Sequence, residues 1–242
     1  MLRFVFNVLT KLPSGIRKPL TKGLIYTLTD IYTTTRVTGL ESIPNGPVVF
    51  VGNHLSNSDG LFLSRALRVK QPVFLAGVKL QDTAMTRVAA ELIDTIPIVP
   101  NSPDRDAIKR AIDTLKSGRS IFIFPEGGRS RSGGLIHGKA GAILIAKKAG
   151  VPIVPVGLQG SDDFLPINDT DMGGEKPQRG AKIEVRIGKP FRLPELLPNW
   201  DEASREEQID ALMLRIADLL DPRYRGVYAN GMPPREPEQK DE

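Results

Sequence analysis

The sequence predicts an α/β protein: a single domain whose mainly parallel sheet is covered by helices on both faces, with an N-terminal amphipathic helical arm. After residue 47, short and wholly apolar runs alternate with stretches of helical periodicity. Strands that are buried on both faces are apolar along their whole length, as these runs are. A chain of 242 residues with 40% hydrophobic content can bury one substantial core.

Five strands and five helices are expected in order along the chain. The strands are residues 48–51, 73–76, 96–99, 120–124 and 151–156; the helices start near residue 60 and cover about 82–92, 103–116, 139–148 and 204–220. Ser102-Pro103 is expected to start the third helix, and Gly118 and Gly150 to end the third and fourth. Ser204 with Glu207 fits a capping box for the last helix.

The composition excludes several classes of site. Without cysteine the chain has no disulfide, no thiolate metal site and no cysteine nucleophile. Its two histidines make a structural zinc site unfavourable. We expect no metal site, and also no cofactor.

The N-terminal arm, residues 1–35, is expected to lie on an anionic membrane surface. The first 40 residues hold six basic side chains and one acidic one, whereas residues 41–242 hold 27 of each. Charges interrupt the arm before the roughly 20 apolar residues needed to cross a bilayer, and no signal-peptide cleavage site is expected before Lys11. A basic amphipathic segment suits a membrane interface. The alternative is a pair of helices that caps the core.

The main domain is predicted to span residues 36–220. Within it, residues 160–180 are rich in Gly, Asp and Pro and form a long loop, either a lid or a plain surface excursion. Residues 221–242 contain few apolar residues and are predicted to be disordered.

A histidine and a carboxylate lie in the short polar link between the first strand and the next helix. His54 follows the strand, and Asp59 lies at the helix start. On one continuous helix the two side chains would point about 140° apart, so a turn is needed to bring them together. A carboxylate bonded to one imidazole nitrogen fixes the tautomer and stabilises the imidazolium, which predicts a general-base pair. The alternative is a surface histidine in a capping loop.

A glycine- and arginine-rich loop, residues 125–134, follows the strand at residues 120–124. Its glycines allow the backbone to approach a ligand, and Arg129 and Arg131 offer forks that suit a phosphate monoester. Loops at the carboxyl ends of parallel strands meet at one edge of a sheet, so this anion site is expected beside His54. The alternative is a flexible, solvated basic loop.

Residues 133–140 also match most of the phosphate-binding loop of NTPases. However, Ala140 stands where a Ser or Thr should hold magnesium, and the pattern begins nine residues after the strand instead of directly behind it. Nucleotide binding is therefore disfavoured. His137, within this stretch, is expected to be a loop residue without a chemical role.

Three ordered blocks resemble the glycerolipid acyltransferase family, which bacterial 1-acylglycerol-3-phosphate acyltransferases typify. They are Asn53-His54 with Asp59 five positions after the histidine, Phe-Pro-Glu-Gly-Gly-Arg-Ser at residues 124–130, and Val-Pro-Ile-Val-Pro-Val at residues 151–156. The likeness covers roughly residues 36–190, with the motifs within 48–160. The family usually has Thr in place of Gly128, so a hydroxyl is missing here. Between the first two blocks the family usually has a basic residue before an apolar strand and an Arg after it. Lys79 resembles the basic residue. No Arg directly follows the strand here, so Arg87 or Arg105 would have to take that place.

The resemblance implies an acyltransferase of phospholipid synthesis. It implies that His54 takes the proton of the sn-2 hydroxyl of lysophosphatidate as that oxygen attacks an acyl thioester, that Asp59 holds the imidazole, and that no acyl-enzyme forms. The implied substrate-binding residues are Glu126 and Gly127 for the glycerol backbone, Arg129 for the phosphate, and Gly128, Ser130 and Lys79. The donor would be acyl-CoA or an acyl-carrier protein, with the acyl chain in an apolar tunnel. The enzyme would be peripheral, at the cytoplasmic face of the cell membrane.

Two alternatives stay open for the function. Within the same class, the acceptor is another lysophospholipid or glycerol 3-phosphate. In a different class, the chain is a non-enzymatic membrane protein that binds phosphate on the same scaffold. No nucleic-acid partner is expected under either.

Overall fold

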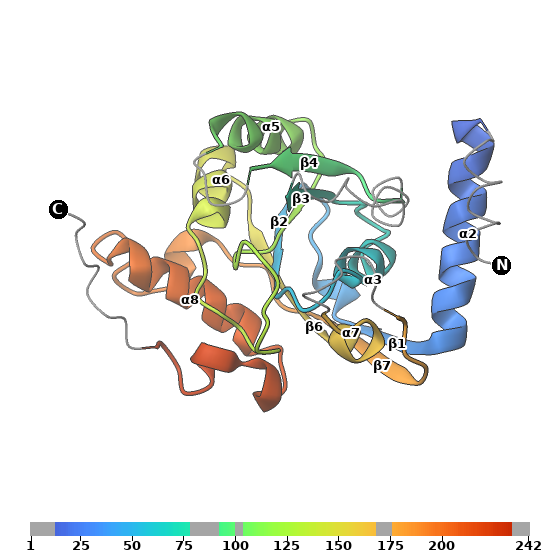
Figure 1. The fold of residues 1–242 in the computed structure, drawn as a ribbon. Coiled ribbons are helices and arrows are strands. Elements are labelled where there is room, and N and C mark those ends of the chain that lie inside the picture. Colours follow the sequence, from blue (N-terminus) through green and yellow to red (C-terminus); the bar gives the residue numbers. More distant parts are fainter. Residues whose placement is uncertain (1–12, 78–91, 100–103, 168–175, 234–242) are drawn as a thin grey trace.

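Seven strands form one sheet in the computed structural model, which describes residues 13–77, 92–99, 104–167 and 176–233. The strands are β1 (Thr33–Thr38), β2 (Val49–Gly52), β3 (Val73–Gly77), β4 (Thr95–Ile98), β5 (Ile121–Ile123), β6 (Ile153–Gln159) and β7 (Ala181–Ile187). Their order is β1-β7-β6-β2-β5-β3-β4 (Figure 1). Strands β6, β2, β5, β3 and β4 run parallel, whereas β7 is antiparallel to β6 and pairs in parallel with β1. The predicted mainly parallel sheet is confirmed.

Helices cover both faces of the sheet, as predicted (Figure 1). The described helices are α2 (Ser14–Tyr32), α3 (Asp59–Ala66), α5 (Arg105–Lys116), α6 (Gly141–Ala149), α7 (Ser161–Phe164) and α8 (Arg205–Ala217), with short 3-10 helices at Leu40–Ser42, Leu193–Glu195, Pro222–Tyr224 and Gly226–Tyr228. One core cluster packs α5, α6 and α8 against the sheet. A second cluster on the other face contains residues of α3 and α7. The carboxyl ends of the central strands lie between these two layers.

The signals for helix ends agree with the structure at most positions. Gly150 adopts φ 68° after α6, and Ser204 forms the capping box of α8 with Glu207. The start of α5 was predicted wrongly, because Asp104 is its N-cap and accepts a hydrogen bond from the Ala107 N–H at 2.9 Å. A carboxylate at this position satisfies a free amide and also favours the positive end of the helix dipole. The helix predicted at residues 82–92 lies outside the described residues except for its last residue.

Two strands were not predicted, although one has a clear sequence signal. Alternate residues of β7 are buried, starting at Ala181 and ending at Ile187, while the residues between them are more exposed. This period-2 pattern is typical of a strand with one buried face. Strand β1 has one large apolar residue, Val37, in a run of threonines and is hard to recognise. It begins at Thr33, so the sheet starts inside the segment that was assigned to the arm.

The prediction of disorder from residue 221 was wrong for the residues that directly follow α8. The segments Pro222–Tyr224 and Gly226–Tyr228 are 3-10 helices, and the rings of Tyr224 and Tyr228 are buried in the core cluster beside α8. Burying two aromatic rings offsets the cost of ordering a short polar segment. Residues 234–242 lie outside the described residues, and so do residues 168–175 in the middle of the long loop.

Candidate active site

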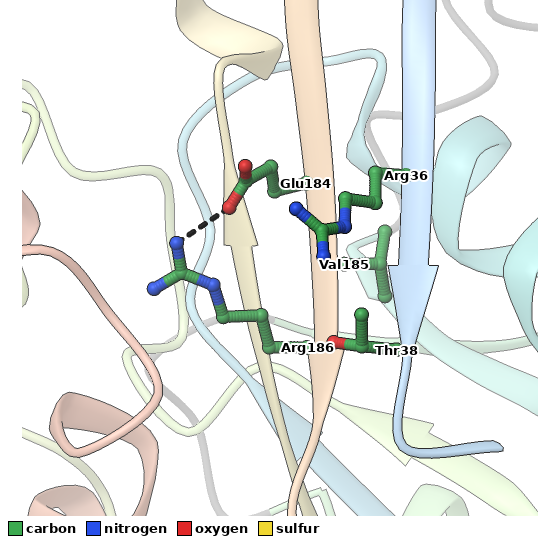
Figure 2. A pocket seen from close by; sticks show the side chains of 5 residues that line it. All are labelled: Arg36, Thr38, Glu184, Val185 and Arg186. Atoms are coloured by element: carbon green, nitrogen blue, oxygen red, sulfur yellow. Dashed lines mark hydrogen bonds and ion pairs between the residues drawn. The ribbon is translucent and has the colours of Figure 1, made fainter.

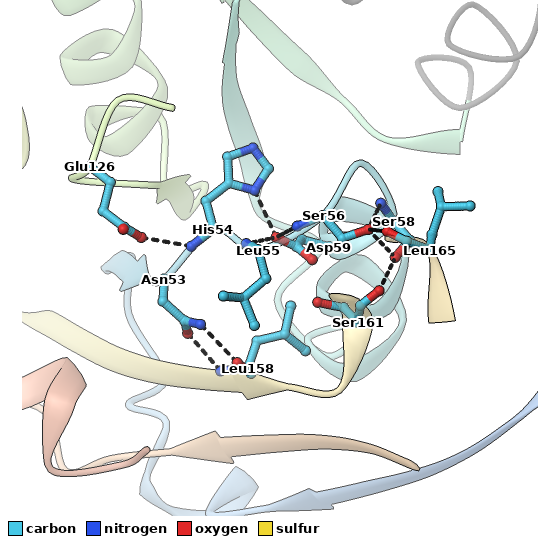
Figure 3. Close-up of polar contacts among 10 residues, drawn as sticks. All are labelled: Asn53, His54, Leu55, Ser56, Ser58, Asp59, Glu126, Leu158, Ser161 and Leu165. Atoms are coloured by element: carbon cyan, nitrogen blue, oxygen red, sulfur yellow. Dashed lines mark hydrogen bonds and ion pairs between the residues drawn. The ribbon is translucent and has the colours of Figure 1, made fainter. Parts of the chain in front are cut away.

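His54 and Asp59 contact each other across the turn that joins β2 to α3. His54 comes two residues after the end of β2, and Asp59 is the first residue of α3. Their side chains meet with His54 Nδ1 2.7 Å from Asp59 Oδ2 (Figure 3). The loop between strand and helix therefore supplies the turn that the spacing of the two residues requires.

The Asp59 carboxylate is fully buried and is held by the backbone of its own turn. Besides His54, Oδ2 accepts hydrogen bonds from the N–H groups of Leu55 at 2.6 Å and Ser56 at 2.9 Å. With Asp59 as acceptor, Nδ1 of His54 carries the proton and Nε2 has a free lone pair. The His54 side chain keeps 22% of its surface exposed, so Nε2 can reach a substrate from the carboxyl edge of the sheet.

Two motif residues to which sequence reasoning assigned no role of their own orient the histidine loop. The Phe124 ring, at the end of β5, stacks on the imidazole with 4.1 Å between ring centroids and 16° between planes. The side chain of Asn53 exchanges two hydrogen bonds of 2.8 Å with the backbone of Leu158 in β6 (Figure 3). The loop is thus attached to the strands on both sides of β2.

Glu126 joins the histidine loop to the glycine-rich loop through backbone groups. Its Oε1 accepts a hydrogen bond from the His54 N–H at 2.8 Å, and its Oε2 accepts one from the Ile136 N–H at 3.1 Å. Burial raises the pKa of Glu126 to about 7, while these two N–H donors favour the ionised form. The sequence suggested a contact with substrate for Glu126, and the structure shows both oxygens bonded within the protein.

The other predicted residues of this loop divide into buried and accessible ones. Ser130 is buried; its N–H donates to the His54 carbonyl at 2.8 Å, and its hydroxyl donates to the Gly134 carbonyl. Gly127 and Gly128 are exposed, and Arg129 is half-buried in the same turn. Lys79 lies outside the described residues.

Lys139, a cation next to the loop, was not predicted as part of the site. Gly127 adopts φ +71°, and a Cβ there would lie 2.9 Å from Nζ of Lys139. Lys139 comes just before α6, and its ammonium group lies against Gly127, two residues before Arg129. Positive charge at this turn is suited to an anion such as a phosphate.

The structure also contains a cavity of about 230 Å³ away from His54, on strands β1 and β7 (Figure 2). It is lined by Arg36, Thr38, Glu184, Val185 and Arg186. Arg186 pairs there with Glu184 at 2.5 Å. Charged walls do not suit a fatty acyl chain, so this cavity is not the apolar tunnel that the resemblance implies.

The fold and the site together define a class: an α/β protein with a histidine–aspartate pair and a cationic glycine-rich loop at the carboxyl edge of its sheet. The acyltransferase family model matches residues 34–159, which is more than half of the chain and contains both loops. The chain belongs to the acyltransferase family.

Individual relatives agree with this membership. The chain is 34% identical to a chloroplastic 1-acyl-sn-glycerol-3-phosphate acyltransferase of Brassica napus over 65% of this chain and 45% of the relative. It is 32% identical to a probable 1-acyl-sn-glycerol-3-phosphate acyltransferase of Mycoplasma pneumoniae over 62% of this chain and 59% of the relative. The chain thus spans about half the length of the curated relatives it matches. The crystal structure of a 1-acyl-sn-glycerophosphate acyltransferase from Thermotoga maritima has a similar fold, with a TM-score of 0.62, 22% identity, and coverage of 89% of this chain and 86% of that one.

Proposed function

We propose that this protein transfers a fatty acyl group from an acyl thioester to the sn-2 hydroxyl of 1-acylglycerol 3-phosphate, giving phosphatidate. The observation that carries the proposal is the 2.7 Å contact between His54 and Asp59 at the edge where the cationic loop also lies. The names of the curated relatives support this acceptor. Family membership supports the reaction class.

The proposed step needs one base and no covalent enzyme intermediate. Nε2 of His54 accepts the proton of the acceptor hydroxyl while the oxygen forms a bond to the thioester carbonyl carbon. The carbon–sulfur bond then breaks, and the leaving thiolate takes the proton from the imidazolium. Asp59 stabilises the imidazolium between these two transfers, since its carboxylate is fixed 2.7 Å from Nδ1.

Arg129 is the proposed phosphate ligand. It lies in the turn whose Ser130 N–H donates a hydrogen bond to the His54 carbonyl. This bond holds the turn that carries Arg129 beside the loop that carries the base. A phosphate held by this turn would orient its glycerol backbone toward His54. Lys139, whose ammonium group lies against Gly127, adds a second positive charge at the same turn.

The arm is proposed to place the protein on an anionic membrane, at the cytoplasmic face. Helix α2 exposes Ile16, Leu20 and Ile31 within about 60° of its circumference. It stands beside the body of the molecule (Figure 1), and among its described hydrophobic residues only Tyr32 packs on the core. This position does not favour the alternative of a core-capping helix. None of the described helices is long and apolar enough to span a bilayer.

The position of the arm relative to the site supports this proposal. Thr33, the first residue after α2, pairs with Ala181, and β7 runs antiparallel to β6, so α2 ends at the edge of the sheet where His54 lies. Arg65 of α3 forms two hydrogen bonds with Asp30 of α2, at 2.5 and 2.9 Å. A membrane bound by α2 would therefore be close to the proposed site.

The reaction and its acceptor are tested by product analysis. The purified protein is offered a mixed pool of lysophospholipids, glycerol 3-phosphate and monoacylglycerol, with acyl-CoA or acyl-carrier protein as donor, and the products are identified by mass spectrometry. We expect phosphatidate as the main product with at least one donor. Transfer to a different acceptor would contradict the proposed substrate. Lipid binding without transfer from any thioester would contradict the proposed activity and favour a non-enzymatic phosphate-binding protein.

A further inference from the structure

Residues 222–228, which follow α8, pair with the end of the glycine-rich loop. The Leu135 N–H donates to the Tyr224 carbonyl at 2.9 Å, and the Leu135 carbonyl accepts from the Val227 N–H at 3.0 Å. Both backbone groups of Leu135 are therefore bonded to this C-terminal segment. Leu135 itself is buried.

The residue after Leu135 connects this pairing to the proposed base. The Ile136 N–H donates to one oxygen of Glu126, and the other oxygen accepts from the His54 N–H. A continuous series of hydrogen bonds therefore runs from the C-terminal segment through Leu135, Ile136 and Glu126 to the backbone of His54. If Leu135 moved, Ile136 would move with it, and Glu126 would lose one of its two donors.

The packing between residues 222–228 and the end of the glycine-rich loop leaves no space for a side chain at Gly226 or Gly134. Gly226 adopts φ +50°, and a Cβ there would lie 2.1 Å from the Leu135 carbonyl oxygen and 2.5 Å from its nitrogen. On the facing side, a Cβ at Gly134 would lie 2.7 Å from the Gly226 Cα. Contacts below 3 Å cannot be accommodated by backbone atoms without displacement.

The C-terminal segment is in turn anchored to the body of the protein. The Tyr224 hydroxyl accepts from the Gly160 N–H at 3.0 Å, at the end of β6, and donates to Asp162 at 3.2 Å. Burial and the nearby Asp162 charge raise the pKa of Tyr224 to about 12, so the phenol keeps its proton at neutral pH. The Tyr228 hydroxyl donates to Asp210 of α8 at 2.7 Å. The segment can therefore act as a fixed support.

We propose that residues 222–228 are a positioning element of the active site, which fixes Leu135 and thereby holds Ile136 and His54 on the two oxygens of Glu126. Gly226 and Tyr224 are its key residues, although neither belongs to the motifs of the site. The role of this element in catalysis rests on the proposed function of His54. The coupling between the segment and the His54 backbone does not, because it can be measured without substrate.

Two glycine substitutions separate this coupling from simple backbone strain. Gly226→Ala introduces the Cβ that collides with Leu135. Gly231→Ala is the matched control, because Gly231 also has a positive φ of +97° but a Cβ there meets nothing within 4 Å. Hydrogen exchange of the full-length protein, resolved to single amides by fragmentation, reports the Ile136 and His54 N–H groups.

In Gly226→Ala we expect both amides to exchange about tenfold faster or more, while buried amides of α5 such as that of Ala111 keep their wild-type rates. Gly231→Ala should leave the exchange rates of the Ile136, His54 and Ala111 amides unchanged. Wild-type exchange at His54 in Gly226→Ala would overturn the proposal, and so would an equal effect of Gly231→Ala. If Gly226→Ala does not fold, Tyr224→Phe replaces it, since the ring stays and only the hydroxyl contacts are lost. Wild-type rates at Ile136 and His54 in that variant would also overturn the proposal.

A transfer assay on the same variants then tests the catalytic consequence. Gly226→Ala should lower kcat about tenfold, and Gly231→Ala should not. A wild-type kcat in Gly226→Ala despite faster His54 exchange would overturn the positioning role. If the wild-type protein transfers no acyl group, the proposed function fails, and the exchange data still decide whether the segment holds His54.

Discussion

At the scale of single residues, the site depends on how Asp59 is buried. A carboxylate removed from water is costly unless its charge is compensated. Here one oxygen of Asp59 contacts three N–H groups, from His54, Leu55 and Ser56. When His54 takes up a proton, the pair becomes an ion pair inside the protein. The turn therefore fixes the Asp59 charge beside the imidazole that the proposed reaction uses.

Arg129 provides a test of the acceptor's phosphate. Arg129→Ala should raise the KM for lysophosphatidate, because an interaction with the phosphate is lost in the ground state and in the transition state alike. The effect is measured by steady-state kinetics at a fixed acyl thioester concentration. Monoacylglycerol, an acceptor without phosphate, is the control substrate. Equal losses on both acceptors would remove Arg129 from this role.

Glu126 provides a test through the pH dependence of stability. Its pKa is 4.5 in an unfolded chain and about 7 in the folded protein. Because folding raises this pKa, the carboxyl contributes stability that is fully present below pH 4.5 and is lost as the pH rises through 7. The free energy of unfolding of the wild type, relative to Glu126→Gln, should fall by about 3 kcal/mol across this window. Urea denaturation at a series of pH values measures it, and a constant difference would contradict the structure.

Sequence reasoning could find some of these residues and not others. The contact of His54 with Asp59 is local, since five residues separate them and the turn signals are clear. Glu126 was identified from its motif, but its partners could not be, because they are backbone N–H groups of His54 and Ile136. Backbone groups carry no residue-specific signal, so only the fold reveals which of them a buried carboxylate meets.

At the scale of elements, a capping box stabilises the start of α8. Ser204 and Glu207 satisfy each other's backbone N–H groups at 3.1 and 2.8 Å. Ser204→Ala should lower the free energy of unfolding by about 1 kcal/mol, because a free amide at the helix start loses its acceptor. Thermal denaturation measures the loss. Wild-type stability would contradict a contribution of this cap, and the kcat should not change.

The same scale shows why some elements were predictable. Strands β2, β3, β5 and β6 are short apolar runs, and this pattern alone indicates a buried strand. Strand β1 and the segment after α8 lack such a pattern. The latter contains two buried tyrosines, Tyr224 and Tyr228, which bond to residues distant in the sequence. The average composition of residues 221–242 does not indicate that these two tyrosines are buried.

At the scale of the whole molecule, the arm gives a test of membrane binding. Lys18 and Lys22 are exposed on α2, and each basic residue near an anionic surface contributes about 1 kcal/mol. Lys18→Glu with Lys22→Glu should weaken binding to phosphatidylserine-containing vesicles by about thirtyfold or more, measured by sedimentation. The control reverses two exposed lysines of α5, Lys109 and Lys116. Equal effects of the two double variants would contradict a specific role of the arm.

The central claim is that His54 is the base of the reaction, and kcat of His54→Ala tests it most directly. The structure predicts that kcat for transfer to lysophosphatidate falls by about 10² to 10⁴ while the circular dichroism spectrum stays unchanged. Asp59→Asn should lower kcat in the same direction. His137→Ala, which removes the other histidine of the chain, should leave kcat unchanged. A wild-type kcat in purified His54→Ala would contradict the account.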